Sequence, residues 1–346
     1  MKKLNNLIII GCSIPALYAA LKCIDLGYKV TIIEKKSTFI SNAEIVYRNY
    51  NIYNNNHKTY ISLLKRFDIK AKKLNVTFDE KFCVIVNNII QKIKLIPNSI
   101  LVSQTLLNLC KHLITDAEFD ALNEYENSFN GIFNVINALD FIHIFTNDLC
   151  SNTTYYYLSD DQINLLISKM TELFISKNGK IIYNNEVKSI RYLKKKYVLV
   201  TNLHNTFTSD LLLTTISKNN LLSFTFWNND QKINLNAVTA INSLIFKNIM
   251  DKLIFNIDSQ DDKNITNVRQ ILLTDMHIVY PYYSNKSKYV FIWNNGSNNI
   301  LIREKIKTMY NDKFIICSES YSKNNMFINY SLEYIDSALI KLYKYI

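Results

Sequence analysis

Glycine and proline are scarce in this chain. Its 346 residues include five glycines and three prolines, where about 7% and about 5% are usual. Turns must therefore rest on Asn and Asp, which tolerate a left-handed backbone better than other non-glycine residues. Each glycine that remains is informative about the backbone at its position: Gly11, Gly27, Gly131, Gly179 and Gly296.

Other absences exclude whole classes of protein. No uninterrupted apolar run reaches the roughly 18 residues of a membrane span, and no fixed-period repeat is present, which argues against an integral membrane protein and a solenoid. The six cysteines form no CxxC pair and no Cys/His cluster with zinc spacing, so we expect no metal site and a reducing compartment such as the cytoplasm. With 48% apolar residues, the chain can bury a core, and its length suggests about two domains.

The charge balance is basic, at +11. An anionic partner such as nucleic acid or a membrane surface would explain this sign. However, Asn, Ile, Lys and Tyr are over-used together, as in proteins encoded by A/T-rich codons, and the basic residues are spread along the chain. The tightest run, residues 194–196, falls where we expect a hairpin turn. Because no clustered basic stripe is present, we expect no specific nucleic-acid partner.

The first residues allow two interpretations. A basic start, an apolar stretch at 7–10 and Cys12 suit either a secretory signal or the first strand of a dinucleotide-binding fold. The following residues favour the fold: 14–26 has the periodicity of an amphipathic helix, Gly27 stops it, and 29–33 is a short buried strand that ends at Glu34. Strand, turn, helix, strand and acid within about 30 residues predict a βαβ unit.

The turn of this unit is a GxSxxA version of the GxGxxG motif. Gly11 would make the tight turn, Ser13 replaces the second glycine, and Ala16 is tolerated where helix and strand pack closely. The helix N-terminus would face a diphosphate, and Glu34 would bind both ribose hydroxyls, which disfavours the 2′-phosphate of NADP. A βαβ unit that has lost its ligand remains the alternative. The expected cofactor contacts here are Gly11, Cys12, Ser13, Ile14, Ala16, Glu34 and Lys35.

Further elements follow in a recognisable order. Residues 160–175 predict an amphipathic helix capped by Ser159, Asn178 and Gly179 a turn, 192–201 a hairpin and 209–217 a buried strand. Together with the opening unit, this order resembles the flavin-containing amine oxidase family, which also includes phytoene-desaturase-like and protoporphyrinogen-oxidase-like enzymes. Residues 57–64 resemble its early helix, and 276–283 with 289–296 resemble two paired strands. In the family an NxxVxxI segment places a valine backbone against adenine, and Val187 matches it.

The resemblance extends to the C-terminal part, with departures. Residues 314–319 resemble the strand and acid that meet the ribityl chain of the flavin, which implies contacts at Ser318 and Glu319. Residues 327–333 resemble the helix start beneath the isoalloxazine ring, which implies a contact at Ile328. The family's glycines are replaced by Ser318 and Tyr330, its acid by Asn329, and its GGR motif by residues 35–39. The adenosine half of the site is therefore the better matched half.

The resemblance implies an α/β protein. Its Rossmann-like FAD-binding domain would comprise residues 1–56, 155–222 and 308–346, and an inserted α+β substrate domain residues 57–154 and 223–307. It also implies FAD and hydride transfer from a small-molecule substrate to flavin N5. We identify no catalytic residue. A histidine on a strand, such as His277, is more often structural than catalytic. Tyr282 and Trp293 could face a flavin, but in a chain this rich in aromatic residues they are more often part of the core or of an exposed sheet face. The alternative is a catalytically inactive scaffold or virion assembly component of a large DNA virus with an A/T-rich genome.

Overall fold

The computed structural model describes residues 5–38, 52–77, 80–128, 153–216, 313–317 and 328–340, with short stretches elsewhere. A five-stranded parallel sheet forms the centre of the fold, with the strand order β16-β10-β1-β2-β6. Strands from three separate parts of the chain meet in it. Their bounds are β1 Asn6–Ile10, β2 Lys29–Ile33, β6 Lys180–Ile182, β10 Leu211–Thr214 and β16 Phe314–Ile316. The predicted α/β class and the predicted βαβ unit are confirmed.

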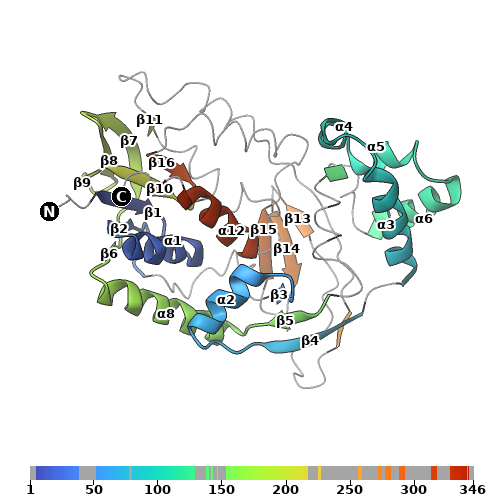
Figure 1. Ribbon diagram of the computed structural model, residues 1–346, viewed down its shortest axis with the longest axis horizontal. Coiled ribbons are helices and arrows are strands. Elements are labelled where there is room, and N and C mark those ends of the chain that lie inside the picture. The colour runs from blue at the N-terminus through green and yellow to red at the C-terminus, as the bar shows by residue number, and fades with distance from the viewer. Residues whose placement is uncertain are drawn as a thin grey trace.

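The sheet is covered on both faces, which explains the unbroken apolar run in β1. Leu7 and Ile9 point into a core shared with the helices α1 (Ile14–Asp25), α8 (Asp160–Ser176) and α12 (Ile328–Leu339). Ile8 and Ile10 point into a second core under the antiparallel strands β7 (Val187–Leu193), β8 (Lys196–Thr201) and β9 (Thr206–Ser209). Because successive strand residues alternate between faces, a strand between two layers must be apolar throughout. Figure 1 shows the resulting three layers.

Local signals determine the ends of the helices. Ser13 caps α1, and Pro15 lies in the first turn, where its missing N–H leaves no bond unmade. Ser159 and Gln162 form a capping box at the start of α8, which ends one residue beyond the predicted range. An ion pair joins α1 to α12, since Nζ of Lys22 on α1 lies 2.6 Å from Oδ1 of Asp336 on α12.

The hairpin lies where the sequence predicts it, but its first strand is longer than predicted. β7 begins already at Val187, and β8 begins at Lys196, so only Lys194 and Lys195 form the turn. Both have positive φ, 48° and 64°. The predicted strand 209–217 is shorter, at Leu211–Thr214, and a strand that the sequence did not indicate, β9, precedes it.

A second region lies beside this core. β3 (Ile52–Asn54), β4 (Lys72–Thr77), β5 (Tyr155–Tyr157) and β12 (Asn256–Asp258) form a sheet with the order β12-β4-β5-β3. Between β3 and β4, α2 (Lys58–Arg66) confirms the expected early helix and packs into the same core as α1 and α12. Of the predicted strand pair, β14 (His277–Pro281) and β15 (Lys288–Ile292) pair antiparallel beside β13 (Leu272–Thr274), whereas Tyr282 and Trp293 lie outside the described residues.

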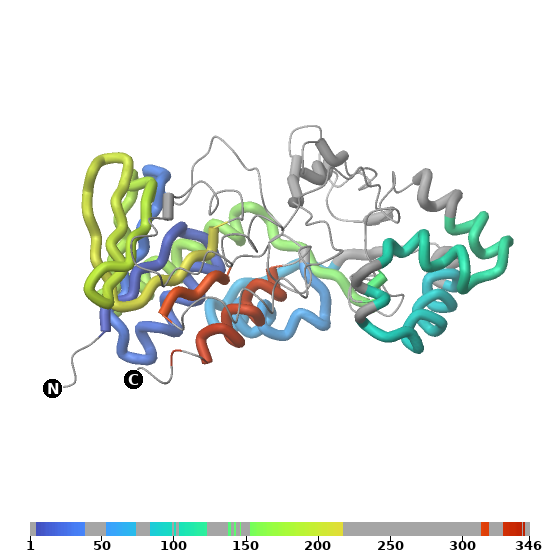
Figure 2. Tube along the Cα trace, turned by 90° about the horizontal axis from the view of Figure 1, so that it is seen from above, coloured from blue at the N-terminus to red at the C-terminus, as the bar shows by residue number. Residues whose placement is uncertain are grey.

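A group of helices occupies one end of the molecule, at the right of Figure 2. It consists of α3 (Glu80–Ile93), α4 (Asn98–Ser103), α5 (Leu106–Cys110) and α6 (Asp116–Ser128). At the opposite end, β11 (Thr225–Phe226) adds to the edge of β7. Among the helices that the structure describes, none is long and apolar enough to cross a membrane.

Candidate functional site

The candidate site lies at the carboxyl edge of the parallel sheet, between β1 and β10. From β1 the chain passes through α1 to β2 and so builds the sheet toward β6, whereas β10 and β16 extend it on the other side of β1. The loops that follow β1 and β10 therefore separate at this point. Such a switch point is where open α/β sheets bind their ligands.

Gly11 is required by the backbone at this edge. Its φ is +89°, and its N–H donates to the carbonyl of Ile33 at 2.9 Å. A Cβ atom here would lie 2.7 Å from Cγ2 of Ile216, which follows β10. A residue with a side chain would therefore be strained by the backbone angle, and its Cβ would also collide with the side chain of Ile216.

The start of α1 combines a filled cap with free donors. The Ser13 hydroxyl accepts from the Ala16 N–H at 3.2 Å and lies 3.4 Å from Oγ1 of Thr215. Ala16 is fully buried, as expected for the position of close helix–strand packing. Within the described residues, the N–H groups of Ser13 and Ile14 make no hydrogen bond. These two donors and the positive end of the helix dipole are available to an anion.

Glu34 is a nearly buried carboxylate held by backbone donors. Its Oε2 accepts from the Cys12 N–H at 2.6 Å, its Oε1 accepts from the Lys36 N–H at 2.9 Å, and the residue is 7% exposed. No cation among the described residues forms an ion pair with it. Since each carboxylate oxygen has two lone pairs, each can still accept one more hydrogen bond. A pair of neighbouring hydroxyl groups would provide those two bonds.

Cys12 contributes its backbone rather than its thiol. Burial, and then the neighbouring Glu34 carboxylate, raise the pKa of the Cys12 thiol far above its ordinary value. The thiolate is the reactive form of cysteine, so this side chain is not a nucleophile at neutral pH.

Val187 and the segment before it lie next to the end of β2. The N–H of Asn185 donates to the carbonyl of Glu34 at 2.9 Å. The amide oxygen of Asn185 accepts from Oγ1 of Thr201 at 3.2 Å and from Nδ2 of Asn205 at 2.9 Å, which fixes the segment. Val187 is buried in the core under β7 and β8. The structure therefore places Val187 near Glu34, while Lys35 is exposed beside it.

The replaced positions on α12 have structural roles. Asn329 is 1% exposed; its Oδ1 accepts from the Tyr60 N–H at 3.0 Å, and its Nδ2 donates to Glu333 at 2.8 Å. The Tyr330 ring lies edge-on to the ring of His57, with centroids 5.6 Å apart. The contact between Asn329 and Tyr60 and the contact between Tyr330 and His57 join the start of α12 to the start of α2.

The remaining predicted contacts are less accessible or are not described. Ile328 is fully buried in the core shared with the helices. Ser318 and Glu319 lie outside the described residues. Among the described residues, no His, Cys, Asp and Glu side chains gather into a group that could hold a metal ion.

Two residues of this edge were missed by the sequence reasoning. Tyr183 directly follows β6, and Thr215 directly follows β10. Because the strands are parallel, the residue after each strand reaches the same edge as Glu34. The signal for both residues is that each directly follows a strand. The sequence does not show where these two strands end, so the signal could not be used.

Comparison with known proteins identifies the fold. Neither models of protein families nor curated proteins match the sequence. Among solved structures, putrescine oxidase with bound putrescine aligns with 98% of this chain and 99% of its own at a TM-score of 0.66 and 10% identity, and its double mutant reaches a TM-score of 0.68 at 9% identity. An archaeal protein from Pyrococcus furiosus aligns over 98% and 97% of the two chains at a TM-score of 0.61 and 12% identity. The chain therefore has the fold of putrescine oxidase, as the resemblance to amine oxidases predicts.

Proposed function

We propose that this protein binds FAD and acts as an FAD-dependent oxidoreductase of the amine-oxidase type on a small-molecule substrate. The observation that carries the proposal is the carboxylate of Glu34. It is nearly buried, it is held by two backbone N–H groups, and it pairs with no cation among the described residues. Burying such a charge is costly unless it is compensated. A ribose diol bound beside the α1 N-terminus would compensate it.

The donors and acceptors at the switch point fit the adenosine diphosphate half of FAD. Gly11 allows the loop to approach the diphosphate, and the free N–H groups of Ser13 and Ile14 would donate to it. Glu34 would accept from the ribose hydroxyls. The backbone at Val187 would lie along the adenine, as the resemblance implies.

The chemistry would come from the flavin, which when bound accepts a hydride from a C–N or C–C bond of the substrate at N5. The residues of this chain would bind and orient the cofactor. Ile328 and the rest of the α12 start would support the ring from the buried side, and Ser318 and Glu319 would contact the ribityl chain. The fold supports this assignment, since putrescine oxidase, whose structure contains putrescine, shares it over nearly the full length.

The test begins with the absorption spectrum of the purified protein. Oxidised flavin absorbs at about 370 and about 450 nm, and we expect both bands together with a higher melting temperature when FAD is added. The variant Glu34→Ala should retain less flavin than the wild type. Glu172→Ala, which removes an exposed carboxylate on α8, is the matched control.

One outcome would contradict the proposal as a whole, and another would contradict only the role given to Glu34. A colourless protein that FAD does not stabilise would leave a catalytically inactive scaffold as the better account of this fold. Full flavin occupancy in Glu34→Ala would refute the ribose assignment, although not flavin binding itself.

A further inference from the structure

Tyr183 lies beside Glu34 on the neighbouring strand. In the pairing of β2 with β6, Ile33 is in register with Ile182, and the Glu34 N–H donates to the carbonyl of Ile182 at 2.9 Å. The next residues along the two strands are Glu34 and Tyr183. Because paired residues of parallel strands project to the same side of the sheet, these two side chains leave it in the same direction.

That direction is toward the start of α1. Ile32 and Ile181, one position before the register pair, pack in the core with the helices, whereas Ile33 packs in the core under β7 and β8. Alternation returns the next residue of each strand to the helix side. The bond between Glu34 and the Cys12 N–H confirms this side for the carboxylate. Tyr183 therefore emerges next to the same loop.

The backbone of Tyr183 is fixed, and its hydroxyl has no partner among the described residues. Nδ2 of Asn185 donates to the carbonyl of Tyr183 at 2.8 Å. The side chain is half-buried, and its hydroxyl makes no hydrogen bond with the residues that the structure describes. Burial, and then Cys12 and Glu34, raise the pKa of the Tyr183 phenol above its ordinary value. The phenol is therefore a protonated hydrogen-bond donor at neutral pH.

We propose that Tyr183 is a second ribose-binding side chain, and that with Glu34 it forms a carboxylate–phenol pair that recognises the vicinal diol of an adenine nucleotide. This inference rests on the proposed function. A carboxylate only accepts hydrogen bonds, so the two sugar hydroxyls that donate to Glu34 still need a donor for their own oxygens. The Tyr183 hydroxyl supplies that donor from the adjacent strand. The pair thus satisfies a diol better than either residue alone.

The experiment measures nucleotide affinity, not enzyme activity. Nucleotide-free full-length protein is titrated by calorimetry with ADP and with its 2′-deoxy and 3′-deoxy analogues. We expect the wild type to prefer ADP, and Tyr183→Phe to bind ADP about 5- to 10-fold more weakly, as for the loss of one neutral hydrogen bond. The preference over at least one deoxy analogue should shrink in the same variant.

A matched control is Tyr156→Phe. Tyr156 lies on β5 and stacks on Tyr53 with ring centroids 5.2 Å apart, so this change removes a hydroxyl from the other sheet. It should leave the affinity for all three nucleotides unchanged. Equal melting temperatures for the two variants would show that both remain folded.

The outcomes separate the two proposals. If Glu34→Gln loses ADP while Tyr183→Phe binds ADP and both analogues like the wild type, the inference on Tyr183 is wrong and the proposed function stands. If the wild type binds neither ADP nor FAD, the proposed function fails and the inference fails with it.

Discussion

The side-chain oxygen of Asn329 accepts a hydrogen bond from the backbone N–H of Tyr60 at 3.0 Å. Tyr60 lies in the first turn of α2, where backbone donors lack partners within the helix. His57, the residue at the N-cap of α2, makes no side-chain capping bond. A residue nearly 270 positions away in sequence therefore caps this helix.

Asn329→Ala should lower the free energy of unfolding. The Tyr60 N–H would lose this buried hydrogen bond, which costs about 1 to 3 kcal/mol. Urea denaturation measures the loss. Ser337→Ala removes an exposed hydroxyl from the same helix and should change stability by less than about 0.5 kcal/mol. Equal stabilities of the two variants would show that the cap is unimportant.

Gly11→Ala should impair both stability and nucleotide binding. The new Cβ would meet Ile216 at 2.7 Å in a backbone conformation of φ +89°. We expect the free energy of unfolding to fall by about 1 to 3 kcal/mol and flavin retention to fall as well. Gly27→Ala is the control, because Gly27 also has a positive φ, of +87°, but follows α1 at its other end. A Gly27→Ala variant that lost flavin equally would assign the effect to general strain.

A glycine in the turn between β7 and β8 should stabilise the folded protein. Lys194 and Lys195 both have positive φ, as in the turn type that favours Asn-Gly. Lys195→Gly should therefore raise the free energy of unfolding by about 1 kcal/mol. The same change one residue later, Lys196→Gly, lies in β8 and should destabilise, because glycine weakens a strand. Thermal melting compares the two, and a shift of the same sign in both would contradict the turn assignment.

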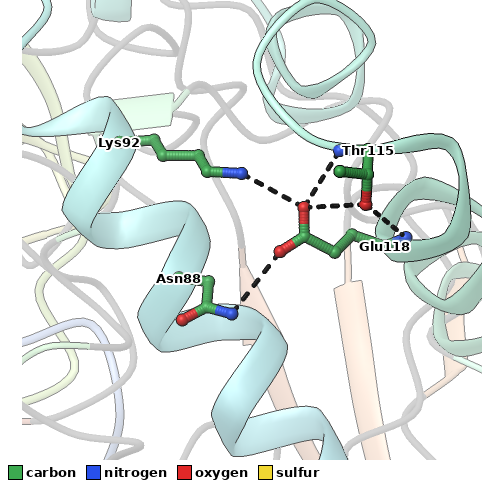
Figure 3. A network of polar contacts seen from close by, with 4 residues as sticks. All are labelled: Asn88, Lys92, Thr115 and Glu118. Atoms are coloured by element: carbon green, nitrogen blue, oxygen red, sulfur yellow. Dashed lines mark hydrogen bonds and ion pairs between the residues drawn. The ribbon is translucent and has the colours of Figure 1, made fainter.

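Glu118 should make the helical end of the molecule sensitive to acid. Its carboxylate accepts from the Thr115 N–H at 2.9 Å and from Lys92 Nζ at 3.1 Å, as Figure 3 shows. The hydrogen bond from the Thr115 backbone, and then Lys92, lower the pKa of Glu118 to about 2. A carboxyl with a lowered pKa stabilises the folded state above its ordinary pKa, and this contribution is lost as pH falls from about 4.5 toward about 2.

Glu118→Gln tests this linkage. Near neutral pH the variant should be less stable than the wild type by about 1 kcal/mol, and the difference should vanish as pH falls through that window. Urea denaturation at several pH values measures it. Glu172→Gln, on the exposed face of α8, serves as the control. A difference that persists unchanged at low pH would refute the role of the charge.

The parts that the sequence could predict depend on residues close together in the chain. The unit from β1 to Glu34 follows from its periodicity, from Gly11 and from the cap at Ser13, all within about 30 residues. The α8 cap and the hairpin turn are equally local. The joining of Asn329 to Tyr60 could not be predicted, because a side chain that caps a distant helix leaves no pattern in the local sequence. The proposed role of Tyr183 could not be predicted either, because it depends on the register between β2 and β6.

The layer formed by α1 and α12 has a consequence for how the protein folds during synthesis. The buried face of α1 contacts α12, and the sheet is completed at one side by β16, yet both elements are encoded after residue 312. Since domains fold as units during translation, the opening βαβ unit must keep apolar surface uncovered until β16 and α12 have also been synthesised. We expect nascent chains that stop before Phe314 to be held by chaperones, whereas chains that include Leu342 fold.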